Sequence, residues 1–182
     1  MRSIELLLDD ASDAAIRAEW TALADHHLPS LASHTSPSNA PHVTLVAGDA
    51  LEVADVPLDA LGALPLPLRF GALSLFPAGR GRFVLVRTLV VTAELLALHA
   101  AVTAAAADPA PTSLPGAWTP HVTLARRLTP EQLATALPLL ATPPIDGTLA
   151  SARFWNGDTA TLTPLKTSHV LQNSSTEDVF RG

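Results

Sequence analysis

Two identical pentapeptides carry the side chains best suited to chemistry in this chain of 182 residues. The segment 41–45 reads Pro-His-Val-Thr-Leu, and 120–124 repeats it after a second proline-containing loop. In a strand, residues two apart share a face and lie about 6.6 Å apart, so each copy directs an imidazole and a hydroxyl to one side. The two copies together present four polar side chains: His42, Thr44, His121 and Thr123.

Two histidines beside one substrate suit acid–base chemistry on a phosphate ester. One imidazole takes a proton from the attacking oxygen, and the other gives a proton to the leaving oxygen. Two threonine hydroxyls can donate hydrogen bonds to the non-bridging phosphate oxygens. A lone histidine at the start of a strand is usually structural, but the duplication with matched threonines favours function. The repeat also indicates two related lobes that each contribute one copy to a shared site.

The elements that must position the two copies mix strands with helices. Periodicity and cap residues predict helices at 14–26 with Ser12 as its cap, at 56–64, at 92–107 with Thr92 as its cap, and after Thr129. Strands are expected at 3–8, 42–47, 65–76, 82–91, 121–126, 147–155 and 160–170. Hairpins replace regular βαβ alternation, which favours an α+β fold. Without a linker, we expect one bilobal domain over residues 1–182.

Composition excludes several classes of protein. The chain is 48% hydrophobic and 15% charged, which excludes an intrinsically disordered protein. The net charge of −6 argues against binding long nucleic acid, so a nucleic-acid substrate should be short or held by a local patch. The absence of cysteine excludes disulfides, iron–sulfur clusters and thiol nucleophiles.

No segment of the sequence predicts export or membrane insertion. The apolar run 4–8 is too short for a signal peptide and ends at two aspartates. The longest apolar stretch, 95–107, falls short of the roughly 20 residues that span a bilayer. We therefore expect a soluble cytoplasmic protein without a membrane partner. The excess of Arg over Lys and the abundance of Ala indicate the compositional bias of a GC-rich bacterial genome.

With these motifs, the chain resembles the 2H phosphoesterase superfamily, and within it the 2′-5′ RNA ligase family of RNA 2′,3′-cyclic phosphodiesterases. The two H-x-T motifs carry the resemblance, together with the opening strand and helix, the continuation 121–126 and the segment 76–85. The family often carries a further aromatic where this chain has Leu85. The resemblance implies two pseudo-symmetric lobes of mainly antiparallel sheet, with outer helices and a central cleft.

The same resemblance implies a metal-independent reaction without a cofactor. Family members open 2′,3′-cyclic phosphates to 2′-phosphates, and some join RNA ends through 2′-5′ linkages without ATP. Carried over to this sequence, His42 and His121 are the acid–base pair, and Thr44 and Thr123 hold the phosphate. The expected substrate is an RNA terminus or a small cyclic nucleotide, and no stable protein partner is implied.

Three further residues are candidates for substrate binding. Arg126 lies an odd number of residues from His121, so an ideal strand would put it on the opposite face unless a bulge turns it back. Arg82, after a glycine-flanked turn, is the other cation that could meet the phosphate or the adjoining nucleotide. Trp118 could stack on a base or anchor the loop before the second motif.

The other histidines are expected to be structural or solvated. His99 is expected at the surface or edge of its Ala-rich helix, and His169 in the last strand. His34 forms an H-x-S pattern with Ser36, but it lies in a loop without strand context, so no function is assigned to it. His26 and His27 lie at a helix end, where a positive charge is favourable to the helix dipole.

Two other functions compete with the phosphodiesterase. One is a binding module that senses a phosphorylated nucleotide without turnover, although binding alone needs no pair of proton-transfer groups. The other is a metal-dependent hydrolase, although two histidines make a poor zinc site without a third ligand. The sequence also leaves open which histidine is the base and whether ligation is physiological.

Overall fold

The computed structural model describes residues 1–34, 36, 38–140 and 144–165. These residues form an α+β fold, as predicted. The strands are β1 (Arg2–Leu8), β2 (His42–Gly48), β3 (Leu66–Pro77), β4 (Phe83–Leu89), β5 (His121–Leu128), β6 (Asp146–Asn156) and β7 (Thr161–Leu165). The helices are α1 (Asp10–Asp25), α2 (Leu58–Leu61), α3 (Ala93–Ala105) and α4 (Pro130–Leu139), with single 3₁₀ turns at η1 (Leu31–Ser33), η2 (Val53–Asp55) and η3 (Pro111–Ser113).

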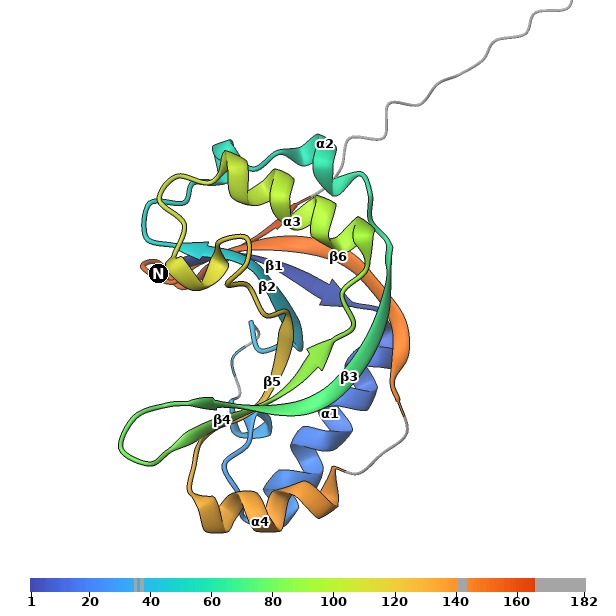
Figure 1. Ribbon diagram of the computed structural model, residues 1–182, viewed down its shortest axis with the longest axis vertical. Helices are drawn as coiled ribbons and strands as arrows, with labels where there is room; N and C mark the ends of the chain where they lie inside the picture. Colours follow the sequence, from blue (N-terminus) through green and yellow to red (C-terminus); the bar gives the residue numbers. More distant parts are fainter. Residues whose placement is uncertain (35, 37, 141–143, 166–182) are drawn as a thin grey trace, which may run out of the picture.

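The sheet brings its two ends together. Its strand order is β2-β1-β6-β3-β4-β5, with β7 also beside β6, and the described pairings are antiparallel. The two motif strands, β2 and β5, are at opposite ends of this order, yet they contact each other because the sheet curves round (Figure 1). The curvature therefore unites two motifs that are far apart in the sequence.

The two halves of the sheet mirror one another in strand order. We call β2-β1-β6 with β7 the first lobe and β5-β4-β3 the second lobe. Helices α2 and α3 cover the outer side of the first lobe, and α1 and α4 cover the second (Figure 1). Helices α1 and α3 thus each pack on the lobe opposite to the strand that precedes them, whereas α4 stays on the lobe of β5. The inner face of the sheet, turned away from these helices, carries the site described below.

Helix boundaries follow their capping residues. Thr92 and Thr129 cap α3 and α4 as predicted, and Thr129 forms a capping box with Gln132. The cap of α1 is Asp9, whose carboxylate accepts a hydrogen bond of 2.9 Å from the backbone N–H of Ser12. The prediction of Ser12 as the cap was therefore wrong by three residues, because the aspartate before it satisfies the same backbone groups.

Two other boundaries differ from prediction. The helix expected over 56–64 consists of the turn η2 and the one-turn helix α2, which starts after Pro57 and ends at Gly62. Proline and glycine restrict the helix to this single turn. The last strand ends at Leu165 within the described residues. His169 and the tail from Gln172 lie outside them.

A buried ion pair locks the outer side of the second lobe. Arg87 of β4 donates from Nε to Glu19 of α1 at 2.7 Å, and from Nη2 to the carbonyl of Leu140, which ends α4, at 2.9 Å. Glu19 and Arg87 are 5% and 4% exposed. The pair fixes α1 and the end of α4 against the sheet.

None of the helices in the described ranges has the length and apolar character needed to cross a bilayer.

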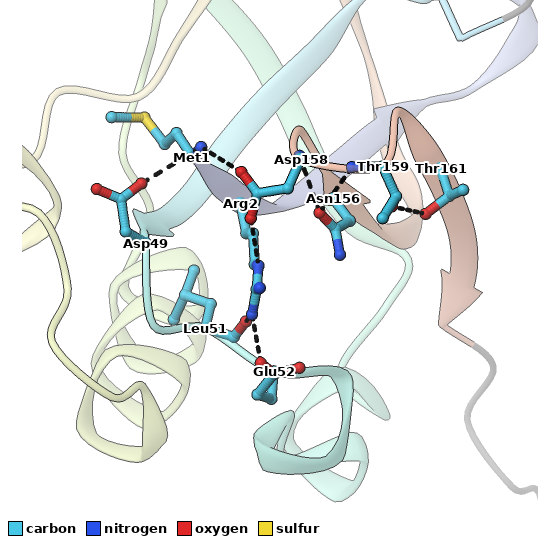
Figure 2. A network of polar contacts seen from close by, with 9 residues as sticks. All are labelled: Met1, Arg2, Asp49, Leu51, Glu52, Asn156, Asp158, Thr159 and Thr161. Carbon is cyan, nitrogen blue, oxygen red and sulfur yellow. Dashed lines mark hydrogen bonds and ion pairs between the residues drawn. The ribbon is translucent and has the colours of Figure 1, made fainter.

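Exposed charges tie the far end of the first lobe together (Figure 2). The amino group of Met1 lies 3.3 Å from Asp49 and 3.5 Å from Asp158. Arg2 forms ion pairs with Asp158 and Glu52, and donates to the carbonyl of Leu51 at 3.0 Å. These contacts connect the start of β1 with the loop after β2 and the β6–β7 turn. Because the acidic partners are exposed, we expect each pair to contribute little to stability.

Candidate active site

Both motif strands carry a β-bulge just after the threonine. In β2 the register with β1 shifts between Thr44 and Val46, and in β5 the register with β4 shifts between Thr123 and Ala125. The extra residue is the motif leucine in each strand, and both leucines are fully buried. The histidine and threonine of each motif are half-buried, whereas the residues between them face the core. The bulges thus preserve one arrangement in both lobes.

The two histidines are oriented by equivalent hydrogen bonds. Nδ1 of His42 lies 2.8 Å from the carbonyl oxygen of Ala40, and Nδ1 of His121 lies 2.7 Å from that of Thr119. A carbonyl oxygen only accepts, so each Nδ1 carries the proton and donates. Nε2 is therefore the nitrogen left for proton exchange in both rings.

Two tryptophans hold the motif threonines in matching ways. The indole N–H of Trp118 donates to the carbonyl of Thr44 at 2.9 Å, and that of Trp20 donates to the carbonyl of Thr123 at 3.0 Å. Within the described part of the chain, neither threonine hydroxyl makes a hydrogen bond. Both hydroxyls are therefore available as donors to a ligand.

The surroundings of His121 favour its neutral form. The ring of Phe76 meets it edge-on, with centroids 4.9 Å apart and planes at 75°. Burial lowers the pKa of His121 below its ordinary 6.5, and the charges of His42 and Arg126 lower it further, against an upward effect of the Thr119 hydrogen bond. The contact between β2 and β5 brings the two motif strands together. A neutral imidazole with a free Nε2 can accept a proton.

The surroundings of His42 are anionic instead. Its Nε2 lies 3.6 Å from a carboxylate oxygen of Glu5, a residue that pairs with Thr44 across β1 and β2. Glu5 in turn accepts a hydrogen bond of 2.8 Å from Nε of Arg153 on β6. The two halves of the site therefore differ in charge although their backbones match.

Arg126 lies on the same side of β5 as His121. The bulge at Leu124 shifts the alternation by one residue, so Ala125 is buried and Arg126 is exposed. A second irregularity follows, where Arg127 has a φ of 65° in the left-handed region. The bulge therefore turns Arg126 back to the face of His121, which was the alternative to an ideal strand that the sequence left open.

A family model described as the 2′-5′ RNA ligase superfamily matches residues 10–161. The chain belongs to this superfamily. Membership confirms the resemblance drawn from the two H-x-T motifs, and it indicates an enzyme of the phosphoesterase and ligase kind with RNA as its class of substrate. No curated protein sequence matches the chain.

Among solved structures, the chain is similar to Usb1 from Kluyveromyces marxianus. The TM-score is 0.47 at 13% sequence identity, and the similarity covers 90% of this chain and 96% of that chain.

The other two predicted substrate contacts, Arg82 and Trp118, have partners within the protein. Arg82 donates from Nη1 to the carbonyl of Arg127 at 3.2 Å, near the outer end of β5. Trp118 stacks on His99 with centroids 4.0 Å apart, so the packing of its ring is that of a loop anchor. Leu85 is fully buried in the core. Contact of Arg82 or Trp118 with substrate stays a prediction.

His99 differs from its prediction. It is 2% exposed and lies between Trp118 and η3, with Nε2 2.8 Å from the carbonyl of Ser113. Burial lowers the pKa of His99, against an opposing effect of that hydrogen bond. The expected surface position was wrong because the loop before the second motif folds back over α3. His34, in contrast, is exposed in a hollow that it shares with Arg17 and Asn39.

Three residues of the inner face were not found from the sequence: Glu5, Arg153 and Phe76. A charged residue inside an apolar strand was the available signal for the first two, since Glu5 interrupts the run 4–8 and Arg153 lies between Ala152 and Phe154. Phe76 gave no such signal. No group of three metal-ligating side chains occurs among the residues that the structure describes.

Proposed function

We propose that the protein is a phosphodiesterase that hydrolyses 2′,3′-cyclic phosphates to 2′-phosphates without a metal. The observation that carries this proposal is the matched orientation of His42 and His121. In both rings Nδ1 donates to a backbone carbonyl and Nε2 is free, and a threonine with an uncommitted hydroxyl lies two residues away. This is the arrangement that two proton transfers across one phosphate require.

His121 is the general base in this proposal. Its lowered pKa leaves the ring neutral at pH 7, so Nε2 can take a proton from the attacking water. The water oxygen then forms a bond to phosphorus while the bond from phosphorus to the 3′-oxygen breaks. His42 gives a proton from Nε2 to the leaving 3′-oxygen. The products are a 2′-phosphate and a 3′-hydroxyl.

Thr44 and Thr123 donate hydrogen bonds to the non-bridging oxygens in this scheme. Such donors lower the barrier where they meet charge that grows in the transition state. Arg126, on the same side as His121, adds a positive charge for an RNA end or a small cyclic nucleotide. With a 5′-hydroxyl in place of water, the same two proton transfers would form a 2′-5′ linkage.

Turnover of a nucleoside 2′,3′-cyclic phosphate in the presence of EDTA tests the proposal. We expect the 2′-phosphate as the product, resolved from the 3′-phosphate by phosphorus NMR or chromatography. The His34→Ala variant serves as the matched control, because this histidine is exposed and belongs to neither motif. It should keep wild-type turnover.

Other outcomes would separate the alternatives. Activity that EDTA abolishes and a divalent metal restores would contradict the metal-independent reaction. Ligand-induced stabilisation without any product, from both a cyclic nucleotide and a short RNA with a cyclic-phosphate end, would favour a binding module.

The acidic limb of the pH profile should lie below pH 6.5. The base acts only when it is neutral, so the rate falls as the pH drops through the lowered pKa of His121. Removing the nearby positive charge with Arg126→Gln should raise that pKa and move the limb to higher pH. The rate of hydrolysis of a cyclic nucleotide, measured as kcat/KM against pH, checks this direction.

An exposed arginine elsewhere provides the control for this shift. Arg69 pairs with Asp146 at 2.8 Å and lies apart from the motifs. Arg69→Gln should leave the acidic limb in place. A limb that moves equally in both variants, or that moves down in Arg126→Gln, would contradict the assignment of His121 as the base.

A further inference from the structure

A buried carboxylate lies directly beside one of the two histidines. Glu5 pairs with Thr44 on one side and with Arg153 on the other, so these three residues form a row across β2, β1 and β6. In the second lobe Val86 takes the corresponding place opposite Thr123. The pseudo-symmetry of the backbone is thus broken by one charge, on the side of His42.

The contacts of Glu5 fix its carboxylate in place. One oxygen, Oε1, accepts a hydrogen bond of 2.9 Å from the hydroxyl of Ser3, and Oε2 accepts one of 2.8 Å from Nε of Arg153. Glu5 and Arg153 are 5% and 8% exposed. Oε1 also lies 3.6 Å from Nε2 of His42, which is the distance of an ion pair without a direct hydrogen bond.

This geometry favours a proton on Nε2 of His42. Nδ1 already donates to the carbonyl of Ala40, so Nε2 carries either a lone pair or a second N–H. A lone pair at that position would face a carboxylate and be repelled, whereas an N–H would be attracted. His121 has the edge of Phe76 and the charge of Arg126 in place of a carboxylate.

We propose that Glu5 is a positioning residue that keeps a proton on Nε2 of His42, with Arg153 holding the Glu5 carboxylate. His42 is thereby prepared as the acid of the reaction. The kinetic consequence of this inference rests on the proposed function, whereas the proton on Nε2 of His42 is a property of the protein without substrate. Glu5 itself exchanges no atom with the substrate.

The other ionisable groups around His42 lie on β5, β6 and α3. His121 on β5 opposes a positive charge on His42, and Arg153 on β6 partly offsets the charge of Glu5. From α3 comes His99, which belongs to the outer side and is bonded to Ser113 of η3. Glu5, on β1, is the anionic group in ion-pair contact with His42 within the described residues.

Nitrogen-15 NMR of the histidine side chains at matched pH tests the inference without any turnover. Glu5→Gln keeps the size of the side chain and its bond from Ser3 but removes the charge. We expect a smaller share of His42 rings to carry a proton on Nε2 in this variant, because the nearby opposite charge that attracts the N–H is lost. Resonances are assigned by their loss in His42→Ala.

The kinetic readout concerns the other limb of the pH profile. If His42 is the acid, the basic limb of kcat/KM should move to lower pH in Glu5→Gln. The variant should therefore lose about tenfold in kcat/KM on that limb and little near the optimum, the effect of losing one nearby opposite charge. A purely structural role for Glu5 would lower the folded fraction at every pH and leave the limb in place.

The chain offers a matched control in its second buried pair. Glu19 is as buried as Glu5 and also binds an arginine, Arg87, but on the outer side of the sheet. Glu19→Gln should leave both the protonation of Nε2 of His42 and the basic limb unchanged. Unchanged protonation of Nε2 of His42 in folded Glu5→Gln would overturn the inference, even where cyclic phosphate is hydrolysed as proposed.

A second variant covers the case in which Glu5→Gln does not fold. The double change Glu5→Gln with Arg153→Met removes both buried charges, which avoids leaving the guanidinium unpaired. The same smaller share of His42 rings with a proton on Nε2 is expected. A share equal to that of the wild-type protein would contradict the inference equally. Failure of turnover in the wild-type protein would contradict the proposed function alone.

Discussion

Replacing His42 or His121 with alanine is expected to lower turnover of a 2′,3′-cyclic phosphate by about 10²–10⁴-fold each. Each variant removes one of the two groups whose Nε2 is free for proton exchange. This range corresponds to a rise of about 2.7–5.5 kcal/mol in the activation barrier. Steady-state kinetics on a cyclic nucleotide measures the loss, and circular dichroism verifies that the variants stay folded.

The double variant is expected to be little worse than either single variant. Residues that act in one concerted step lose most of their contribution when one member is removed. Thr44→Ala and Thr123→Ala should lose less, because water can partly replace a neutral hydroxyl donor. Near-wild-type turnover in either histidine variant would contradict the two-histidine mechanism.

Replacing Glu19 with alanine is expected to lower the free energy of unfolding by about 3–5 kcal/mol. The change leaves the guanidinium of Arg87 buried without its carboxylate partner, between α1 and the end of α4. Domains of this kind have about 5–15 kcal/mol in total, so the loss would be a large share. Urea denaturation followed by tryptophan fluorescence measures it.

Two comparisons isolate the ion pair from other effects. Asp25→Ala, at an exposed position of the same helix, should change the free energy of unfolding by no more than about 0.5 kcal/mol. The paired change Glu19→Leu with Arg87→Met should recover much of the loss, because it leaves no buried charge. A loss in Glu19→Ala no larger than in Asp25→Ala would contradict this account of the pair.

Local patterns were sufficient for most of the elements and for placing the two motifs on strands. The two H-x-T motifs could be placed on strands because period-two alternation is a property of a few consecutive residues. Caps such as Thr92 and Thr129 act within three residues, so they too were visible in the sequence. The superfamily could be recognised for the same reason, since its motifs are short and contiguous.

Features that depend on register or on distant packing could not be predicted in this way. The side of the strand that Arg126 occupies depends on a bulge, and the burial of His99 depends on a loop that folds back from further along the chain. Neither leaves a local pattern, because in each case the partner is set by the packing of the sheet and its helices.

The difference between the two histidines has the same origin. The repeat makes His42 and His121 equivalent in the sequence, down to the residues on either side. Their neighbours in space come from other strands: Glu5 and Arg153 beside His42, and Phe76 beside His121. The pentapeptide was enough to indicate two proton-transfer groups. Their unequal surroundings arise only when the curved sheet brings non-repeated residues against them, because electrostatic and desolvation effects act through space and not along the chain.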